Sequence, residues 1–508
     1  MEMNNLSTQP TSEVRKFTGD TLWLSLALGT QMLLGFIVLP IMTKVFPTEL
    51  YGVWTQILAT MVIISTITIM GLDITYIKFL GGVQEKEQIR DALGTVFWPV
   101  FTVGCLLCIC SFFGQSSLSS VIFGDPKFAH FIPPIFFWSL GQALFLLSYS
   151  YYKATLEIKR VAIIQIISNG CQNIAIYVLA IIGVDLIWIV ISCVIVQFVF
   201  TAINLLGIIA KVGLPSAHIR GLKKYLLFGI PLLPSSLLLW ILSSIDRFFV
   251  TNILGVSQAG IYSVSRSLAN LCAFFLTPIA YNMFYTISGL WKKGEINRVK
   301  SYFEHSVKLF LTMAIPAAVG LAIISPSLLK ILTTTEYVIP WELVLMLTLG
   351  VLFMGIYQIN VYVILLIEQT KWLPLIMLIA AATNVGMNTI LIPRIGINGA
   401  AISNIVSFFI QAVIVTFWAR IAISYRFDFK YVGKIIFATL LLAVYLWFVK
   451  IDSIIGIILV IIGGVALYII AFLLMKPFSI QDKEIIKDVG GGIISKLRFY
   501  KRFKTIHK

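Results

Sequence analysis

The sequence has 508 residues, of which 59% are hydrophobic and 12% are charged, and its formal net charge is +16. Average globular chains carry about 25% charged residues, so a soluble protein of this length could not cover its surface with so few. Intrinsic disorder is excluded because it requires low hydrophobicity, and a nucleic-acid-binding protein would need a basic soluble face that is missing here. The composition therefore predicts an integral membrane protein with many spans.

Apolar runs long enough to cross a bilayer follow one another along the chain. A bilayer core takes about 20 apolar residues per helix, and breaks at charged or turn-rich segments give about fourteen such runs. In chain order they are roughly 21–42, 53–72, 92–113, 132–152, 161–182, 186–209, 225–246, 260–285, 305–324, 341–366, 372–392, 399–419, 431–449 and 453–475. The runs are continuous rather than alternating, which favours helices over strands of a membrane barrel. We therefore expect an all-α polytopic membrane protein with about 14 transmembrane helices.

The basic residues are distributed unevenly over the connectors between these runs. With the N-terminus in the cytoplasm, the cytoplasmic connectors and termini hold 30 of the 38 lysines and arginines, and the outer connectors hold 6. Cytoplasmic loops of membrane proteins carry such an excess. We therefore expect a multi-pass protein of the plasma (inner) membrane with both termini in the cytoplasm. Its basic face would contact anionic lipids rather than nucleic acid.

Three short patterns recur at nearly one spacing. The matching pairs are 52–54 with 260–262, 182–185 with 395–398, and Asn173 with Asn384, at offsets of 208, 213 and 211 residues. This predicts duplication of a six-helix unit, with two lobes in parallel topology related by a pseudo-twofold axis. The expected domains are an N-lobe at 1–210, a C-lobe at 211–422, two further helices at 423–475 and a basic cytoplasmic tail at 476–508.

Three passages, with loose but ordered motifs, carry a resemblance to a known family. They are Leu39-Pro40 to Trp54; Phe228-Gly229-Ile230-Pro231 through Asp246-Arg247 to Tyr262-Ser263; and Asn384 through Ile392-Pro393-Arg394 to Ala401. Over about residues 15–475 the sequence resembles the polysaccharide transporters, or lipid-linked oligosaccharide flippases, of the multidrug/oligosaccharidyl-lipid/polysaccharide exporter superfamily. O-antigen flippases are of this kind.

The resemblance implies a V-shaped twelve-helix core with two extra helices. It also implies a transporter, not an enzyme, that moves a polyprenyl-diphosphate-linked oligosaccharide from the cytoplasmic to the outer leaflet for surface polysaccharide assembly. Such a protein would act as a monomer, with polysaccharide polymerase machinery as a possible partner. The alternative is a cation-coupled small-molecule or drug antiporter of the same superfamily, which would need acidic residues in its cavity. A membrane enzyme such as a polymerase would need a large loop with catalytic groups, and the outer connectors are short.

Basic residues in or beside the spans are the candidates for binding an anionic diphosphate. A charge at mid-helix costs about 2.5–3.5 kcal/mol by insertion scales, so each such residue needs a reason. Arg266 is the first candidate, and in the lipid II flippases that this chain resembles a cavity arginine follows a tyrosine by four residues, as Arg266 follows Tyr262. The alternative for Arg266 is snorkelling to the outer headgroups. The further candidates are Lys308, Lys44, Arg247 and Lys78.

Each further candidate also has a structural interpretation. Lys308 lies near the cytoplasmic face and could snorkel, Lys44 could pair with Glu49, and Lys78 could form a surface pair with Asp73. Adjacent helical residues point about 100° apart, so Asp246 and Arg247 cannot both face lipid.

Asp246 and Asp73 are the carboxylates we expect to serve in ion coupling or gating, with Na⁺ or H⁺ as the coupling ion. No other cofactor is expected, because the G-x-x-x-x-G-K-[ST] motif of ATP sites is missing from the sequence. No metal site is expected either, since the four histidines are scattered over connectors and the tail.

Overall fold

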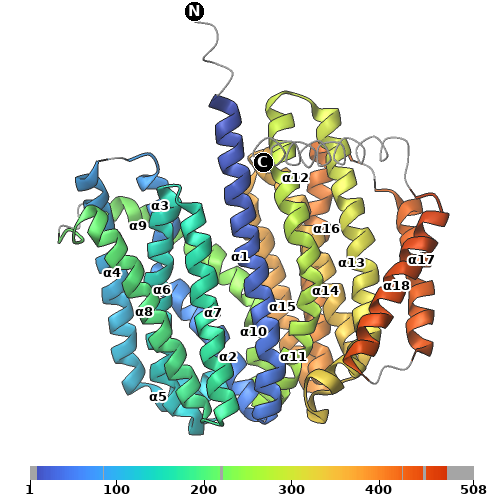
Figure 1. Cartoon of the computed structure of the whole chain (residues 1–508), viewed down its shortest axis with the longest axis horizontal. Coiled ribbons are helices and arrows are strands. Elements are labelled where there is room, and N and C mark those ends of the chain that lie inside the picture. The colour runs from blue at the N-terminus through green and yellow to red at the C-terminus, as the bar shows by residue number, and fades with distance from the viewer. Residues whose placement is uncertain (1–8, 84, 218–220, 426, 450–452, 478–508) are drawn as a thin grey trace, which may run out of the picture. The chain divides into compact units, whose positions relative to one another are not determined.

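The computed structural model describes residues 9–83, 85–217, 221–425, 427–449 and 453–477. Within these ranges the regular secondary structure is entirely helical (Figure 1). The α-helices are α1 (Gln9–Val45), α2 (Thr48–Ile69), α3 (Leu72–Leu80), α4 (Lys86–Phe113), α5 (Gln115–Phe123), α6 (Ile132–Ala154), α7 (Ile158–Ile182), α8 (Leu186–Val212), α9 (Leu222–Gly229), α10 (Leu233–Leu254), α11 (Val256–Asn270), α12 (Leu276–Lys292), α13 (Ile296–Leu332), α14 (Trp341–Leu366), α15 (Leu373–Ile395), α16 (Ile397–Ile423), α17 (Phe429–Phe448) and α18 (Ile454–Leu474). Short 3₁₀ turns are η1 (Pro126–Phe131), η2 (Ile230–Leu232), η3 (Leu271–Phe275), η4 (Thr335–Tyr337) and η5 (Thr370–Trp372). The prediction of an all-α polytopic protein is confirmed.

Twelve helical segments of the described chain are long and apolar enough to cross a membrane. They coincide with predicted runs two to seven and nine to fourteen. Run one lies in α1, which is helical from Gln9 to Val45. Run eight, predicted as one helix over 260–285, contains the 3₁₀ turn η3 between α11 and α12. The count of fourteen is not confirmed.

The described helices form two compact units. The first contains the chain through Ser267 together with Leu332–Ile339 and Pro374–Ser407. Inside it, α1 packs along α7, while α6 lies among α2, α4 and α8 (Figure 1). The central position of α6 agrees with its sequence, since most of its residues are buried, including hydroxyl-bearing ones such as Ser139 and Ser148 that hydrogen-bond to their own helix.

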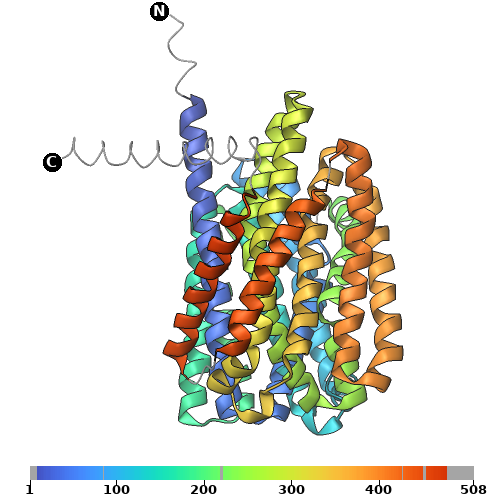
Figure 2. The same cartoon turned by 90° about the vertical axis from the view of Figure 1, so that its right-hand side faces the viewer.

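The second unit contains Leu268–Ile331, Pro340–Leu373 and the chain from Phe408 onward. Helices α17 and α18 form a hairpin at its edge (Figure 2). The predicted basic tail lies outside the described residues from position 478 onward. The lobe boundary at residue 210 stays a prediction.

The backbone carries the duplication that the loop patterns predicted. Three turns at helix ends have a residue with positive φ, and each has a counterpart 211 to 213 residues later. The pairs are Leu156 with Glu368, Gly183 with Gly396, and Gly213 with Ser424. Leu156 and Glu368 have φ of 58° and 57°, a backbone conformation that residues other than glycine rarely adopt. A shared unusual backbone at matched positions supports the internal repeat independently of residue identity.

Candidate functional site

A one-residue turn brings charged residues from two helices together. Helix α10 ends at Leu254, Gly255 turns the chain with φ of 94°, and α11 begins at Val256. The two helices therefore run back along each other, so that Asp246 on α10 faces Arg266 on α11. Glycine suits this turn because it adopts positive φ without a steric penalty.

The carboxylate of Asp246 accepts three hydrogen bonds within the cluster. Its Oδ2 accepts hydrogen bonds from Arg266 Nη1 at 2.6 Å and from the Tyr262 hydroxyl at 2.6 Å. Its Oδ1 accepts the backbone N–H of Arg247 at 2.9 Å. The Asp246 side chain is 1% exposed and that of Arg266 is 13% exposed. This is a buried ion pair, in which each partner makes the other's burial tolerable.

Arg247 brings a second guanidinium to the same place without a carboxylate of its own. Its Nη2 donates to Ser244 Oγ at 3.0 Å, and its buried Nε has no hydrogen-bond partner within the described chain. No Asp or Glu oxygen of the described residues forms an ion pair with it. The cluster of Asp246, Arg247, Tyr262 and Arg266, called here the α10–α11 charge cluster, therefore contains two guanidiniums and one carboxylate.

Helix α2 closes against α10 and α11 beside this cluster. A Cβ added to Gly52 would collide with the carbonyl of Val256, and a Cβ added to Gly260 would collide with the carbonyl of Thr48. Both glycines are needed because they let two helix starts approach to backbone contact. The contact is reciprocal: an offset of 208 residues converts Gly52 into Gly260 and Thr48 into Val256.

Polar side chains join the same helices just beyond the glycines. Thr55 Oγ1 accepts from Ser263 Oγ at 3.1 Å, and these two residues are also 208 apart. Gln56 Nε2 donates to Thr251 Oγ1 at 2.9 Å and to the carbonyl of Ile122 at 3.0 Å. The duplicated loops thus meet each other symmetrically, as the two halves of a twofold interface do. The repeat is visible in the sequence, whereas this contact between its two copies is not.

The described contacts of Lys308 lie in the second unit. Its Nζ pairs with Asp428 Oδ2 at 3.4 Å and lies 5.1 Å from the ring centroid of Tyr431. Both partners come from the start of the C-terminal hairpin. The ammonium is therefore engaged within its own unit.

The described contacts of Lys44 and Lys78 do not include residues of the cluster. Lys44 is exposed at the end of α1, and Glu49, its suggested partner, pairs instead with Lys127 at 2.6 Å. The Lys78 ammonium lies 3.7 Å from the ring centroid of Phe228, and no ion pair with Asp73 occurs in the described structure. Burial raises the pKa of Asp73, which lies on the short helix α3 between the spans.

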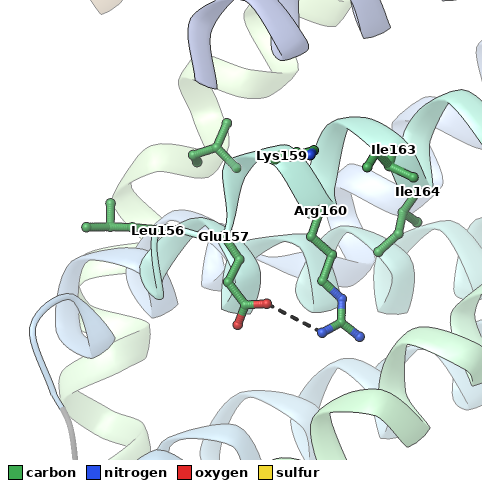
Figure 3. Close-up of a pocket in the computed structure, with 7 residues that line it drawn as sticks. Leu156, Glu157, Lys159, Arg160, Ile163 and Ile164 are labelled. Carbon is green, nitrogen blue, oxygen red and sulfur yellow. Dashed lines mark hydrogen bonds and ion pairs between the residues drawn. The ribbon is translucent and has the colours of Figure 1, made fainter. Parts of the chain in front are cut away.

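A shallow pocket at the α6–α7 turn is lined by charged residues that the sequence did not point to (Figure 3). Glu157 pairs with Lys211 at 2.6 Å and with Arg160 at 3.4 Å. Burial opposes ionisation of Glu157, but the hydrogen bond and charge of Lys211 outweigh it and lower its pKa. The Glu157–Lys211 ion pair joins the start of α7 to α8, as a structural contact does. Groups of three or more potential metal ligands are absent from the described residues.

The comparison with protein families gives one match that covers most of the first unit. The model described as polysaccharide biosynthesis protein matches residues 41–339, which is more than half of the chain. Among curated proteins, the probable low-salt glycan biosynthesis flippase Agl15 of Haloferax volcanii is 23% identical over 242 residues, or 47% of this chain and 50% of that protein. The chain therefore spans about half the length of this relative.

Solved structures match over a longer range. The lipid II flippase MurJ in an inward closed conformation superposes with a TM-score of 0.75 at 16% identity, covering 92% of this chain and 99% of that one. An inward-facing multidrug resistance MATE family transporter of the MOP superfamily gives 0.64 at 12% identity, covering 78% and 94%. At such identities these matches establish the fold and leave the cargo open.

Proposed function

This chain belongs to the polysaccharide biosynthesis protein family, and on that premise we propose that it flips a polyprenyl-diphosphate-linked oligosaccharide across the membrane. The movement is from the cytoplasmic to the outer leaflet of the plasma membrane, by alternating access, with both termini in the cytoplasm. A relative named as a glycan biosynthesis flippase and the fold shared with a lipid II flippase support lipid-linked cargo.

The observation that carries the proposal is the excess guanidinium of the α10–α11 charge cluster. Asp246 compensates Arg266, while the side chain of Arg247 keeps a buried Nε without a partner in the described chain. A desolvated cation without a carboxylate is stabilised by an anion that arrives from outside. A diphosphate supplies the oxygens that a guanidinium binds best. Arg247 is therefore the first residue we assign to the cargo, with Arg266 as the second cation available when its pair with Asp246 opens.

Asp246 is the carboxylate that we assign to ion coupling. When a diphosphate attracts Arg266, Asp246 loses its compensating charge while still buried. A proton or Na⁺ would then neutralise it, since an uncompensated buried carboxylate is unstable. Cargo binding and ion binding would thereby favour each other through one ion pair.

The reciprocal contact of α2 with α10 and α11 is the part of the first unit that we assign to closure on the outer side. Gly52 and Gly260 allow backbone contact there, and Thr55 and Ser263 hydrogen-bond across it. Release of a large glycan to the outer leaflet requires these helix starts to separate.

The antiporter alternative shares the fold, as the MATE neighbour shows. A cationic drug would require an excess of carboxylates at its site. The charge cluster has the opposite balance, which favours an anionic cargo.

The test is a flipping assay in proteoliposomes with a fluorescent polyprenyl-diphosphate oligosaccharide. Arg247→Ala is expected to lower the initial rate at least about tenfold, the effect of losing about 1.4 kcal/mol of charge-assisted bonding. Lys127→Ala, which removes an exposed cation near the same end of α2, serves as the matched control and should stay within twofold. Unchanged flipping by Arg247→Ala at equal protein amount would remove Arg247 from the cargo site.

A second experiment tests the closure. Thr55→Cys with Ser263→Cys, in a chain whose six native cysteines are replaced, places two thiols where the hydroxyl oxygens lie 3.1 Å apart. Oxidation is expected to stop flipping and a reductant to restore it. Full transport by the oxidised, cross-linked protein would show that this contact does not open during the cycle.

A further inference from the structure

Helix α13 contains two prolines, and each leaves one carbonyl without its helical donor. In an α-helix the N–H of residue i bonds to the carbonyl of residue i−4, and proline has no N–H. Pro316 therefore frees the carbonyl of Thr312, and Pro326 frees that of Ala322. Inside a membrane such a carbonyl needs another donor, because lipid supplies none.

The two carbonyls find their donors in different ways. Ser325 Oγ, on the same helix, donates to the carbonyl of Ala322 at 2.7 Å. The carbonyl of Thr312 accepts from the hydroxyl of Tyr468 on α18 at 2.8 Å. The carbonyl freed by Pro326 is thus satisfied locally, whereas the carbonyl freed by Pro316 depends on the C-terminal hairpin. Tyr468 is buried, so water does not readily replace its hydroxyl.

Further contacts fasten the same turn of α13 to the hairpin. Thr312 Oγ1 lies 2.9 Å from the hydroxyl of Tyr431 on α17, and it donates to the carbonyl of Lys308 one turn earlier. Lys308 in turn pairs with Asp428, whose Oδ1 accepts the backbone N–H of Tyr431 at 3.0 Å and so caps α17. The rings of Tyr431 and Tyr468 both pack on Phe472, with centroids 5.7 Å away in each case.

One turn beyond Pro316, α13 faces apolar side chains of the hairpin at Gly320. A Cβ on Gly320 would lie 3.6 Å from a methyl of Leu446 and 3.8 Å from one of Leu442, both on α17. The polar contacts are therefore concentrated on the Lys308–Pro316 segment, where the backbone of α13 is incomplete.

We propose that the α17–α18 hairpin is a brace that stabilises α13 at Pro316, with Tyr468 as a positioning residue that supplies the donor missing from the backbone. The hairpin lies outside the duplicated six-helix units, and this contact gives it a defined task. A change in the backbone of α13 at Pro316 would break the Tyr468 bond, so a movement of α13 at this point is coupled to the hairpin. The inference rests on the contacts of the second unit and is independent of the cargo.

The test is a double-mutant cycle of Tyr468→Phe and Pro316→Ala, read by hydrogen exchange of the full-length protein in nanodiscs. Tyr468→Phe removes one oxygen and keeps the ring on Phe472. Exchange of the amides in residues 313–320 is expected to rise about tenfold, the effect of leaving one buried acceptor unsatisfied. Pro316→Ala restores the backbone donor, so Tyr468→Phe should then change exchange by less than twofold.

Ser325→Ala is the matched control, because it removes the local donor at the second proline. It should raise exchange around residue 326 and leave 313–320 unchanged. An equal effect of Tyr468→Phe with and without Pro316 would reduce Tyr468 to ordinary packing and overturn the proposal. So would an unchanged exchange of 313–320 in the Tyr468→Phe protein. Flipping rates of the same four proteins, measured separately, report on the cargo hypothesis without entering this result.

Discussion

Two clusters in different units of the molecule each contain an aspartate, a basic residue and a tyrosine in contact. In the α10–α11 charge cluster these are Asp246, Arg266 and Tyr262, and at the start of the hairpin they are Asp428, Lys308 and Tyr431. In the first, the aspartate and the cation are 1% and 13% exposed; in the second, they are 43% and 19% exposed.

The chemistry of the two sets is similar, and their surroundings differ. A half-exposed pair gains little because water competes for both charges. A buried pair is costly to assemble and still more costly to break, because the remaining charge has no other partner. The degree of burial, rather than the residue type, therefore decides how much free energy it costs to break each ion pair.

The largest expected effect is the loss of Arg266. Arg266→Met leaves Asp246 buried without its ion-pair partner, and we expect a destabilisation of about 3–5 kcal/mol. The measurement is the unfolding free energy in detergent micelles. The Asp246→Asn, Arg266→Met double variant removes both charges and should recover at least half of the loss. A destabilisation below about 1 kcal/mol for Arg266→Met would show that this pair contributes no more than the half-exposed one.

The two tyrosines provide a second, smaller contrast. Tyr262 donates to the carboxylate of Asp246, so Tyr262→Phe should cost about 1.5–3 kcal/mol, as for hydrogen bonds to charged groups. Tyr431 bonds to the neutral hydroxyl of Thr312, so Tyr431→Phe should cost about 0.5–1.5 kcal/mol. Unfolding free energies of both variants test the order. A larger loss of unfolding free energy for Tyr431→Phe would mean that the hairpin contact contributes more to stability than the hydrogen bond in the charge cluster.

The sequence could predict the helices and the repeat because both leave local traces. Continuous apolar runs of about 20 residues define spans, and they located twelve candidate spans correctly. Run eight was read as one helix because its composition is apolar throughout, while the break at η3 is a matter of backbone geometry. Gly52 and Gly260 were visible as a recurring pattern, but their close approach depends on how α2 crosses α11.

The site was harder to predict, since its members come from two helices. Arg266 was singled out as a charge inside a predicted span, and its pairing with Asp246 was not predicted. The two residues are 20 positions apart, and only the turn at Gly255 brings them face to face. The same turn pairs Asp246 with Arg266, so that Arg247 has no ion-pair partner among the described residues. Spacing within one helix carries no information of that kind.

The smallest expected effect on stability is that of replacing Lys308, and it should depend on the salt concentration. Lys308→Met removes a half-exposed ion pair and a cation–π contact, each of which contributes about 0.5–1 kcal/mol or less. Salt at 1 M reduces the Debye length to about 3 Å, which screens the ion pair while leaving the contact with Tyr431 largely intact. The stability difference between the native protein and Lys308→Met should therefore fall by about half between 0.05 M and 1 M NaCl. The corresponding difference for Arg266→Met should hardly change, because the Asp246 side chain is only 1% exposed and salt screens a buried pair much less. Equal salt dependence at both positions would contradict the assignment of the α10–α11 charge cluster as the desolvated one.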